Sequence, residues 1–124
     1  MAKLRHIAIR TRDPEQTAAW YKEAFGLTEV GRARSGVYLS DGDINIAVLL
    51  TNSETTGGEV PPGLHHLGFL VENVEDTCSR LATLGAERLS PAPQADQYFE
   101  VKHRGPDGVE FDISEHGWAG ARPL

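Results

Sequence analysis

Alternation of apolar and polar residues predicts two strands that lie sixty positions apart in the chain. In the stretch RHIAIRT, the two isoleucines share one face of an extended chain and His6 lies on the other face. In the stretch HLGFLV, Leu67 and Phe69 share one face and His66 lies on the other. A period of two is typical of a strand with one buried face. Each predicted strand therefore carries a histidine near its start.

A helix is predicted directly after each of these strands. In the first copy, Asp13 is a suitable N-cap, Pro14 fits the first helical turn, and Gly26 ends the helix. In the second copy, Asn73 is the N-cap and Gly85 ends the helix. In both copies, residues recur at the helical spacing of a face that packs on the sheet. They are Thr17, Trp20, Tyr21, Ala24 and Phe25 in the first copy and Val74, Cys78, Leu81 and Leu84 in the second.

Three β-type segments follow each predicted helix, so the order βαβββ occurs twice and predicts an α+β fold. These segments are residues 27–33, 36–42 and 44–50 in the first half, and 86–90, 97–104 and 109–114 in the second. We expect a single domain over residues 1–124. Its parts are module 1 at about 1–52, a polar Gly/Pro-rich linker at 53–63, and module 2 at about 64–124.

Two βαβββ modules in tandem can pair into a curved half-barrel whose helix-free face surrounds a cavity. Because Ile7 and Leu67 would face the helices, His6 and His66 would turn toward this cavity at equivalent points of the repeat. Two imidazoles at a shared centre indicate a metal site, which a carboxylate usually completes. The stretch VEFDIS offers Glu110 and Asp112 on its polar face, and alternation does not choose between them.

Composition narrows the class of partner. The chain has 124 residues and a net charge of −6, which argues against binding to nucleic acid or to an acidic membrane surface. Cys78 is the single cysteine, so no internal disulfide can form, and a reducing cytoplasm is expected. No apolar run approaches the roughly 20 residues that span a bilayer, and the N-terminus does not read as a secretory signal. We expect a cytoplasmic protein.

The repeated βαβββ order, the opening HIAIRTRDPEQTAAWYKEAFGL, and the motifs HHLGFLVENVE and GPDGVEFDIS together resemble the vicinal oxygen chelate superfamily. This superfamily has the glyoxalase/bleomycin resistance/dioxygenase-like fold. The resemblance implies that His6, His66 and Asp112 are metal ligands, with Asp112 four positions after Gly108, where the superfamily normally has glutamate. Glu110 is the alternative carboxylate ligand.

The resemblance also implies a further ligand position on the last strand of the first half. This position falls on Ala47, or on Ile46 if the register differs by one, and neither side chain can bind a metal. Two histidines and one carboxylate with open coordination positions suit Fe(II) and oxygen chemistry. We therefore expect Fe²⁺ or Mn²⁺, with Ni²⁺ or Zn²⁺ as alternatives. The predicted function is a dioxygenase-like enzyme that chelates a small substrate through vicinal oxygens.

Acid–base groups near the bound substrate are expected for such a reaction. The stretch QYFEVKHR supplies Tyr98 and His103 as predicted catalytic residues, and alternation puts Tyr98, Glu100 and Lys102 on one face. The sequence does not decide which face of this strand looks into the cavity. Trp118, in the C-terminal segment, is expected to pack in the core or at an interface, or to close the cavity.

Two other functions stay open at this point. One is a metal-dependent lyase or isomerase similar to glyoxalase I, and the other is a non-enzymatic small-molecule binder similar to bleomycin resistance proteins. A homodimer is expected because single-domain members of the superfamily usually pair. The sequence is compatible both with a site inside one chain and with a site shared across a dimer.

Overall fold

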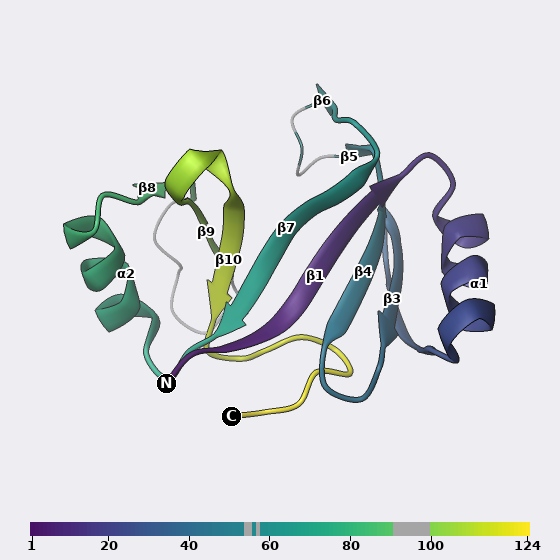
Figure 1. Ribbon diagram of the computed structural model, residues 1–124, viewed down its shortest axis with the longest axis horizontal. Coiled ribbons are helices and arrows are strands. Elements are labelled where there is room, and N and C mark those ends of the chain that lie inside the picture. The colour runs from purple at the N-terminus through teal and green to yellow at the C-terminus, as the bar shows by residue number, and fades with distance from the viewer. Residues whose placement is uncertain (54–55, 57, 91–99) are drawn as a thin grey trace.

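A mixed sheet curls around one face of the protein without closing into a barrel (Figure 1). The computed structural model describes residues 1–53, 56, 58–90 and 100–124, and over these residues the sheet has eight strands in the order β2-β3-β4-β1-β7-β10-β9-β8. The first four strands are β1 (Lys3–Thr11), β2 (Thr28–Ala33), β3 (Gly36–Ser40) and β4 (Asn45–Leu50). The others are β7 (Gly63–Leu70), β8 (Glu87–Arg88), β9 (Val101–Arg104) and β10 (Glu110–Ser114).

The two halves of the sheet repeat one topology. Strand β1 pairs in parallel with β4, and β7 pairs in parallel with β10. The halves meet where β1 and β7 pair antiparallel at the middle of the sheet. With helix α1 (Pro14–Phe25) after β1 and helix α2 (Val74–Thr83) after β7, the predicted βαβββ repeat and the α+β class are confirmed. A short two-stranded ribbon, β5 (Asn52–Ser53) and β6 (Gly58–Glu59), lies where module 1 joins the linker, and the sequence did not predict it.

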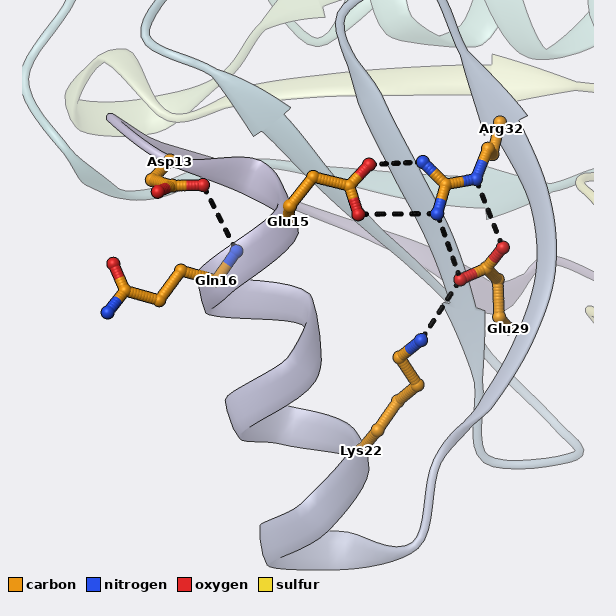
Figure 2. Close-up of polar contacts among 6 residues, drawn as sticks. All are labelled: Asp13, Glu15, Gln16, Lys22, Glu29 and Arg32. Carbon is orange, nitrogen blue, oxygen red and sulfur yellow. Dashed lines mark hydrogen bonds and ion pairs between the residues drawn. The ribbon is translucent and has the colours of Figure 1, made fainter.

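The caps predicted for the two helices are present. The Asp13 carboxylate accepts a hydrogen bond from the Gln16 backbone N–H at 3.1 Å, which satisfies one of the free donors of the first turn of α1 (Figure 2). Gly26 ends α1 in the left-handed region with φ 67°. The Asn73 side chain accepts from the Asp76 N–H at 2.8 Å at the start of α2.

A network of exposed charges joins α1 to β2 (Figure 2). Arg32 on β2 makes a paired contact with the Glu15 carboxylate on α1 and also binds Glu29. Lys22 on α1 reaches Glu29 at 3.0 Å. Because these side chains are largely solvent-exposed, the ion pairs are expected to add little to stability.

Each helix covers its own small core, on the opposite side of the sheet from the repeat's histidines. Under α1 the buried core residues are Ala18, Val37, Leu39 and Val48, and under α2 they are Val71, Val74, Val101 and Ile113. The α1 stripe differs from the sequence pattern, because Trp20 and Phe25 are 60% and 67% exposed. The helix instead buries Ala18 and packs Tyr21 against the core. Trp20 and Phe25 contact the Tyr21 ring from the solvent side.

The segment after β10 crosses beneath the sheet toward the lower end of β4 (Figure 1). It is fixed there because the Ser40 hydroxyl donates to the Gly120 carbonyl at 2.7 Å and the Arg122 N–H donates to the Asp43 carbonyl at 2.9 Å. Among the described residues, no helix is long and apolar enough to span a membrane.

Candidate metal centre

Three side chains from three adjacent strands meet on the helix-free face of the sheet. They are His6 on β1, His66 on β7 and Asp112 on β10, each 2–6% exposed. One ligand atom from each lies within 4.8 Å of the others. The Nε2 atoms of His6 and His66 are 3.2 Å apart, and His66 Nε2 is 3.2 Å from Asp112 Oδ2. The structure brings these residues together within one chain.

The backbone register explains this convergence. Gly68 on β7 lies opposite His6 on β1 and beside Asp112 on β10, and His66 lies two residues before it. A Cβ atom at Gly68 would approach the His6 side chain to 2.6 Å and Trp118 to 2.9 Å. The ring of His6 therefore occupies the space that any side chain at Gly68 would need.

Asn45 fixes the protonation of His6. The Asn45 amide nitrogen donates to the Ala119 carbonyl at 2.8 Å, so the amide oxygen faces His6 Nδ1 at 2.7 Å. An amide oxygen only accepts, so Nδ1 must carry the ring proton and Nε2 presents its lone pair to the centre. Burial, with a smaller contribution from His66, lowers the pKa of His6 to about 4. His6 is thus neutral at pH 7 and ready to bind a metal.

His65 plays the corresponding part for His66. Their Nδ1 atoms are 2.7 Å apart, which requires one proton between two nitrogens. His66 Nε2 faces two acceptors, His6 Nε2 and Asp112 Oδ2, so it carries a proton in the metal-free protein, and a bound metal would replace that proton. Burial, and then the neighbouring His66, lowers the pKa of His65.

Asp112 is held as a carboxylate. Burial alone would raise its pKa, but hydrogen bonding to His66 and the charge of Lys102 lower it below its usual range. Lys102 Nζ is 2.8 Å from Asp112 Oδ1, and Oδ2 faces His66. One oxygen is therefore bound by the lysine and the other is directed to the centre.

Glu100 is a further acid at this site that the sequence did not single out. Its carboxyl lines the same cavity as Asp112. Burial, followed by the neighbouring Asp112, raises the pKa of Glu100 to about 8. Alternation in the sequence already put Glu100 on the same strand face as Lys102. The sequence did not show that this face lines the cavity.

The other predicted site residues are not part of this three-residue cluster. His103 lies on the opposite face of β9 from Lys102, 2% exposed, with its ring stacked on Phe111 at a centroid distance of 5.7 Å. This position is on the side of the α2 core, so His103 does not line the cavity. Tyr98 lies outside the described residues. Glu110 lines the cavity but is not in the three-residue cluster, which contains Asp112.

The register also identifies the empty fourth position. Asp112 lies beside Gly68 in the second half, and Ala47 lies beside Ala8, the repeat equivalent of Gly68, in the first half. Ala47 is fully buried and lines the cavity, whereas Ile46 packs against the α1 core. The repeat therefore puts a methyl group where the other half has a carboxylate.

The cluster opens into a cavity of about 930 Å³, large enough for a small organic molecule. Away from the cluster the cavity is lined by charged, aromatic and aliphatic side chains, including Arg10, Tyr38, Leu49 and Glu110. Two imidazoles and one carboxylate, buried on one side and open on the other, suit a divalent cation that also binds a substrate. The residues present therefore fit a metal.

A sequence model of the Glyoxalase/Bleomycin resistance protein/Dioxygenase superfamily matches residues 3–113. The chain belongs to this superfamily. A search of curated proteins finds no match.

Solved structures with the fold of this superfamily are similar to the chain. Hypothetical protein BH1468 from Bacillus halodurans C-125 is 21% identical with a TM-score of 0.71, covering 91% of this chain and 93% of its own. Methylmalonyl-CoA epimerase from Mycobacterium tuberculosis is 19% identical with a TM-score of 0.67, covering 90% and 85%. The 2,3-dioxygenase LapB from Pseudomonas sp. KL28 is 19% identical with a TM-score of 0.69, covering 96% and 42%. At these identities the likeness shows the fold.

Proposed function

We propose that this protein is a dioxygenase-like metalloenzyme of the superfamily. It holds one divalent cation with His6, His66 and Asp112 and binds a small substrate through two adjacent oxygens. The observation that carries this proposal is Ala47, which faces the cavity where the repeat would put a fourth ligand. Three ligands leave room for two substrate oxygens and a further small molecule.

When bound, Fe(II) would supply a Lewis acid and an electron-transfer centre for a substrate that O2 oxidises. In this class of reaction the substrate provides the electrons that reduce O2, and both oxygen atoms enter the product, so no external reductant is consumed. The chain's own residues orient the ligand side chains and keep water away from the centre. Asn45 and His65 hold the two imidazoles, and the buried position of the cluster limits the access of water.

Proton transfer is assigned to Glu100 in place of His103. The Glu100 carboxyl shares the cavity with Asp112, whereas His103 lies on the far side of the sheet. Because its pKa is raised to about 8, Glu100 carries a proton at pH 7, and it can donate this proton to the bound substrate and take one back from the product. Lys102 keeps Asp112 ionised while this occurs.

An oxygen electrode tests the proposal. Protein loaded with Fe(II) is mixed with a panel of catechols and α-keto-hydroxy compounds, and oxygen uptake is followed. We expect uptake with at least one compound, and we expect a chelator to stop it. Ligand binding that a chelator leaves unchanged, with no oxygen uptake, would instead favour a sequestering protein.

Glu100 also supports a second candidate function, a glyoxalase-type isomerase. Such a reaction needs a carboxylate that moves a proton, and Glu100 supplies one where Ala47 does not. This candidate predicts that Ni(II) or Zn(II) protein isomerises a hemithioacetal under nitrogen. Turnover under nitrogen together with no oxygen uptake in air would select the isomerase.

We further propose that the chain forms a homodimer and acts in the cytoplasm. Sedimentation at micromolar concentration checks the first point, and a monomer there would refute it. Because the three ligands come from one chain, two inactive variants such as His6→Ala and Asp112→Ala should not restore each other's activity on mixing.

A further inference from the structure

We propose that residues 116–120, which follow the last strand, are part of the metal centre and position His6 as a ligand through Trp118 and Asn45. This inference rests on the proposed function, because it concerns the metal that His6 would bind. The segment lies beyond residues 3–113, the part of the chain that matches the superfamily model.

The first contact of the segment is with the ring of His6. The indole of Trp118 stacks on the imidazole with centroids 4.9 Å apart and an angle of 5° between the rings. Gly68 lies close to the same imidazole, and a Cβ there would meet both rings. Trp118 and the β7 backbone together prevent the His6 ring from turning about its χ angles.

The second contact acts through Asn45. The Ala119 carbonyl accepts from the Asn45 amide nitrogen, and this bond decides which end of the amide faces His6. A reversed amide would put its oxygen against the Ala119 carbonyl and an N–H against His6 Nδ1. With the observed orientation, the His6 proton stays on Nδ1 and Nε2 points to His66 and Asp112.

The segment itself is firmly attached to the first half of the sheet. The Gly120 carbonyl accepts from Ser40, and Gly120 has φ 74° and a position where a Cβ would lie 2.7 Å from Ser40 and 2.8 Å from Val30. The segment thus runs from β10, which carries Asp112, to β4, which carries Asn45. It links the two halves of the candidate centre.

Substitutions of Asn45 in the full chain test this inference by titration with Ni(II). We expect Asn45→Leu to weaken Ni(II) binding by about 10- to 100-fold, the usual cost of removing the group that orients a ligand histidine. Asn45→Asp should lose less, because its carboxylate still accepts from His6 Nδ1. Glu110→Leu is the matched control, since Glu110 lines the same cavity from β10 without contacting a proposed ligand, and it should stay within about threefold of wild type.

Two spectroscopic readouts separate positioning from a general loss of structure. In Trp20→Phe protein, Trp118 is the single tryptophan, and its emission should fall as Ni(II) binds one equivalent. In Trp118→Phe protein, the exposed Trp20 should respond little. Imidazole ¹⁵N NMR of metal-free protein should show His6 as the Nδ1–H tautomer in wild type and a mixture in Asn45→Leu.

Unchanged Ni(II) affinity in Asn45→Leu, with the same His6 tautomer as wild type, would overturn this inference. If wild type binds none of Fe(II), Mn(II), Ni(II) and Zn(II), the proposed function fails instead. The tautomer measurement still decides the present inference in that case, because it uses metal-free protein.

Discussion

The two halves of the sheet have the same topology but contribute unequally to the candidate centre. The first half gives His6 and has Ala47 at the position equivalent to Asp112, whereas the second half gives both His66 and Asp112. A symmetric scaffold thus carries an asymmetric site. Duplication of the fold thus determines which positions face the metal. The residue at each of these positions determines whether it is a ligand or leaves that side of the metal open.

The halves also differ in how their histidines are supported. His66 is contacted by His65, its neighbour in the same strand. His6 depends on Asn45 and on Trp118, which belongs to the C-terminal segment of the chain. The histidine of the first half is therefore supported in part by the C-terminal segment that follows β10 in the second half.

Removing a ligand side chain should reduce metal affinity more than any other substitution. We expect His66→Ala and Asp112→Ala to weaken metal binding by more than about 100-fold, because orienting groups alone cost 10- to 100-fold. Glu110→Ala, on the same strand as Asp112, should keep the metal. Elemental analysis after dialysis against Ni(II) checks this. Loss of metal in Glu110→Ala with retention in Asp112→Ala would show that the carboxylate ligand is Glu110.

The pH dependence of stability comes next, and it involves one group from each half. The pKa of His6 falls from 6.5 in the unfolded chain to about 4, so acid favours unfolding between these values. The pKa of Glu100 rises from 4.5 to about 8, so stability from Glu100 is lost as pH rises through this range. In metal-free wild type, the effects of His6 and Glu100 on the free energy of unfolding oppose each other below pH 6.5. The free energy of unfolding should therefore fall with rising pH only above pH 6.5.

Variants separate these two effects. His6→Asn should become less stable steadily from about pH 4.5 to 8, and Glu100→Gln should gain roughly 3 kcal/mol from pH 4 to 6.5 and then level off. Urea unfolding at each pH measures the free energy. The same profile in wild type and both variants would mean that neither group titrates as assigned.

Gly68→Ala tests whether the two halves differ in the room for a side chain beside the ligand histidine. The equivalent residue in the first half is Ala8, which lies opposite His66 without conflict. At Gly68 a methyl group would collide with His6 and Trp118. We expect a loss of about 1–3 kcal/mol in unfolding free energy, typical of overpacking, and weaker metal binding. Wild-type values for both would show that the stack on His6 is loose.

Ala47→Glu should restore the symmetry of the ligand set. The added carboxylate would occupy the open position, so metal should bind about tenfold more tightly, or roughly 1.4 kcal/mol, and oxygen uptake should fall to background. Ala47→Val is the control, because it adds volume without a ligand atom. Oxygen uptake that survives in Ala47→Glu would contradict the role assigned to Ala47.

Much of this arrangement could be predicted from residue patterns. Alternation put His6 and His66 on the face opposite the apolar residues that follow them, and the cap residues Asp13 and Asn73 marked the helix starts. These features depend on neighbours in the chain. They were accessible because the periods of strands and helices are local properties.

The remaining features depend on contacts between distant segments. Asn45 meets His6 only through the β1–β4 register, and the roles of Glu100 and His103 follow from which face of β9 looks into the cavity. Trp20 is exposed because α1 packs on the sheet through Ala18 and Tyr21. Helical spacing alone does not determine which apolar residues of α1 face the sheet.

Metal titration of the wild-type chain tests the central claim most directly. Metal-free protein is dialysed separately against Fe(II), Mn(II), Ni(II) and Zn(II), washed, and analysed for bound metal per chain. We predict one equivalent of at least one of these ions, lost on Asp112→Ala substitution and retained on Glu110→Gln substitution. Protein that stays metal-free with all four ions would contradict the assignment of His6, His66 and Asp112 as a metal centre.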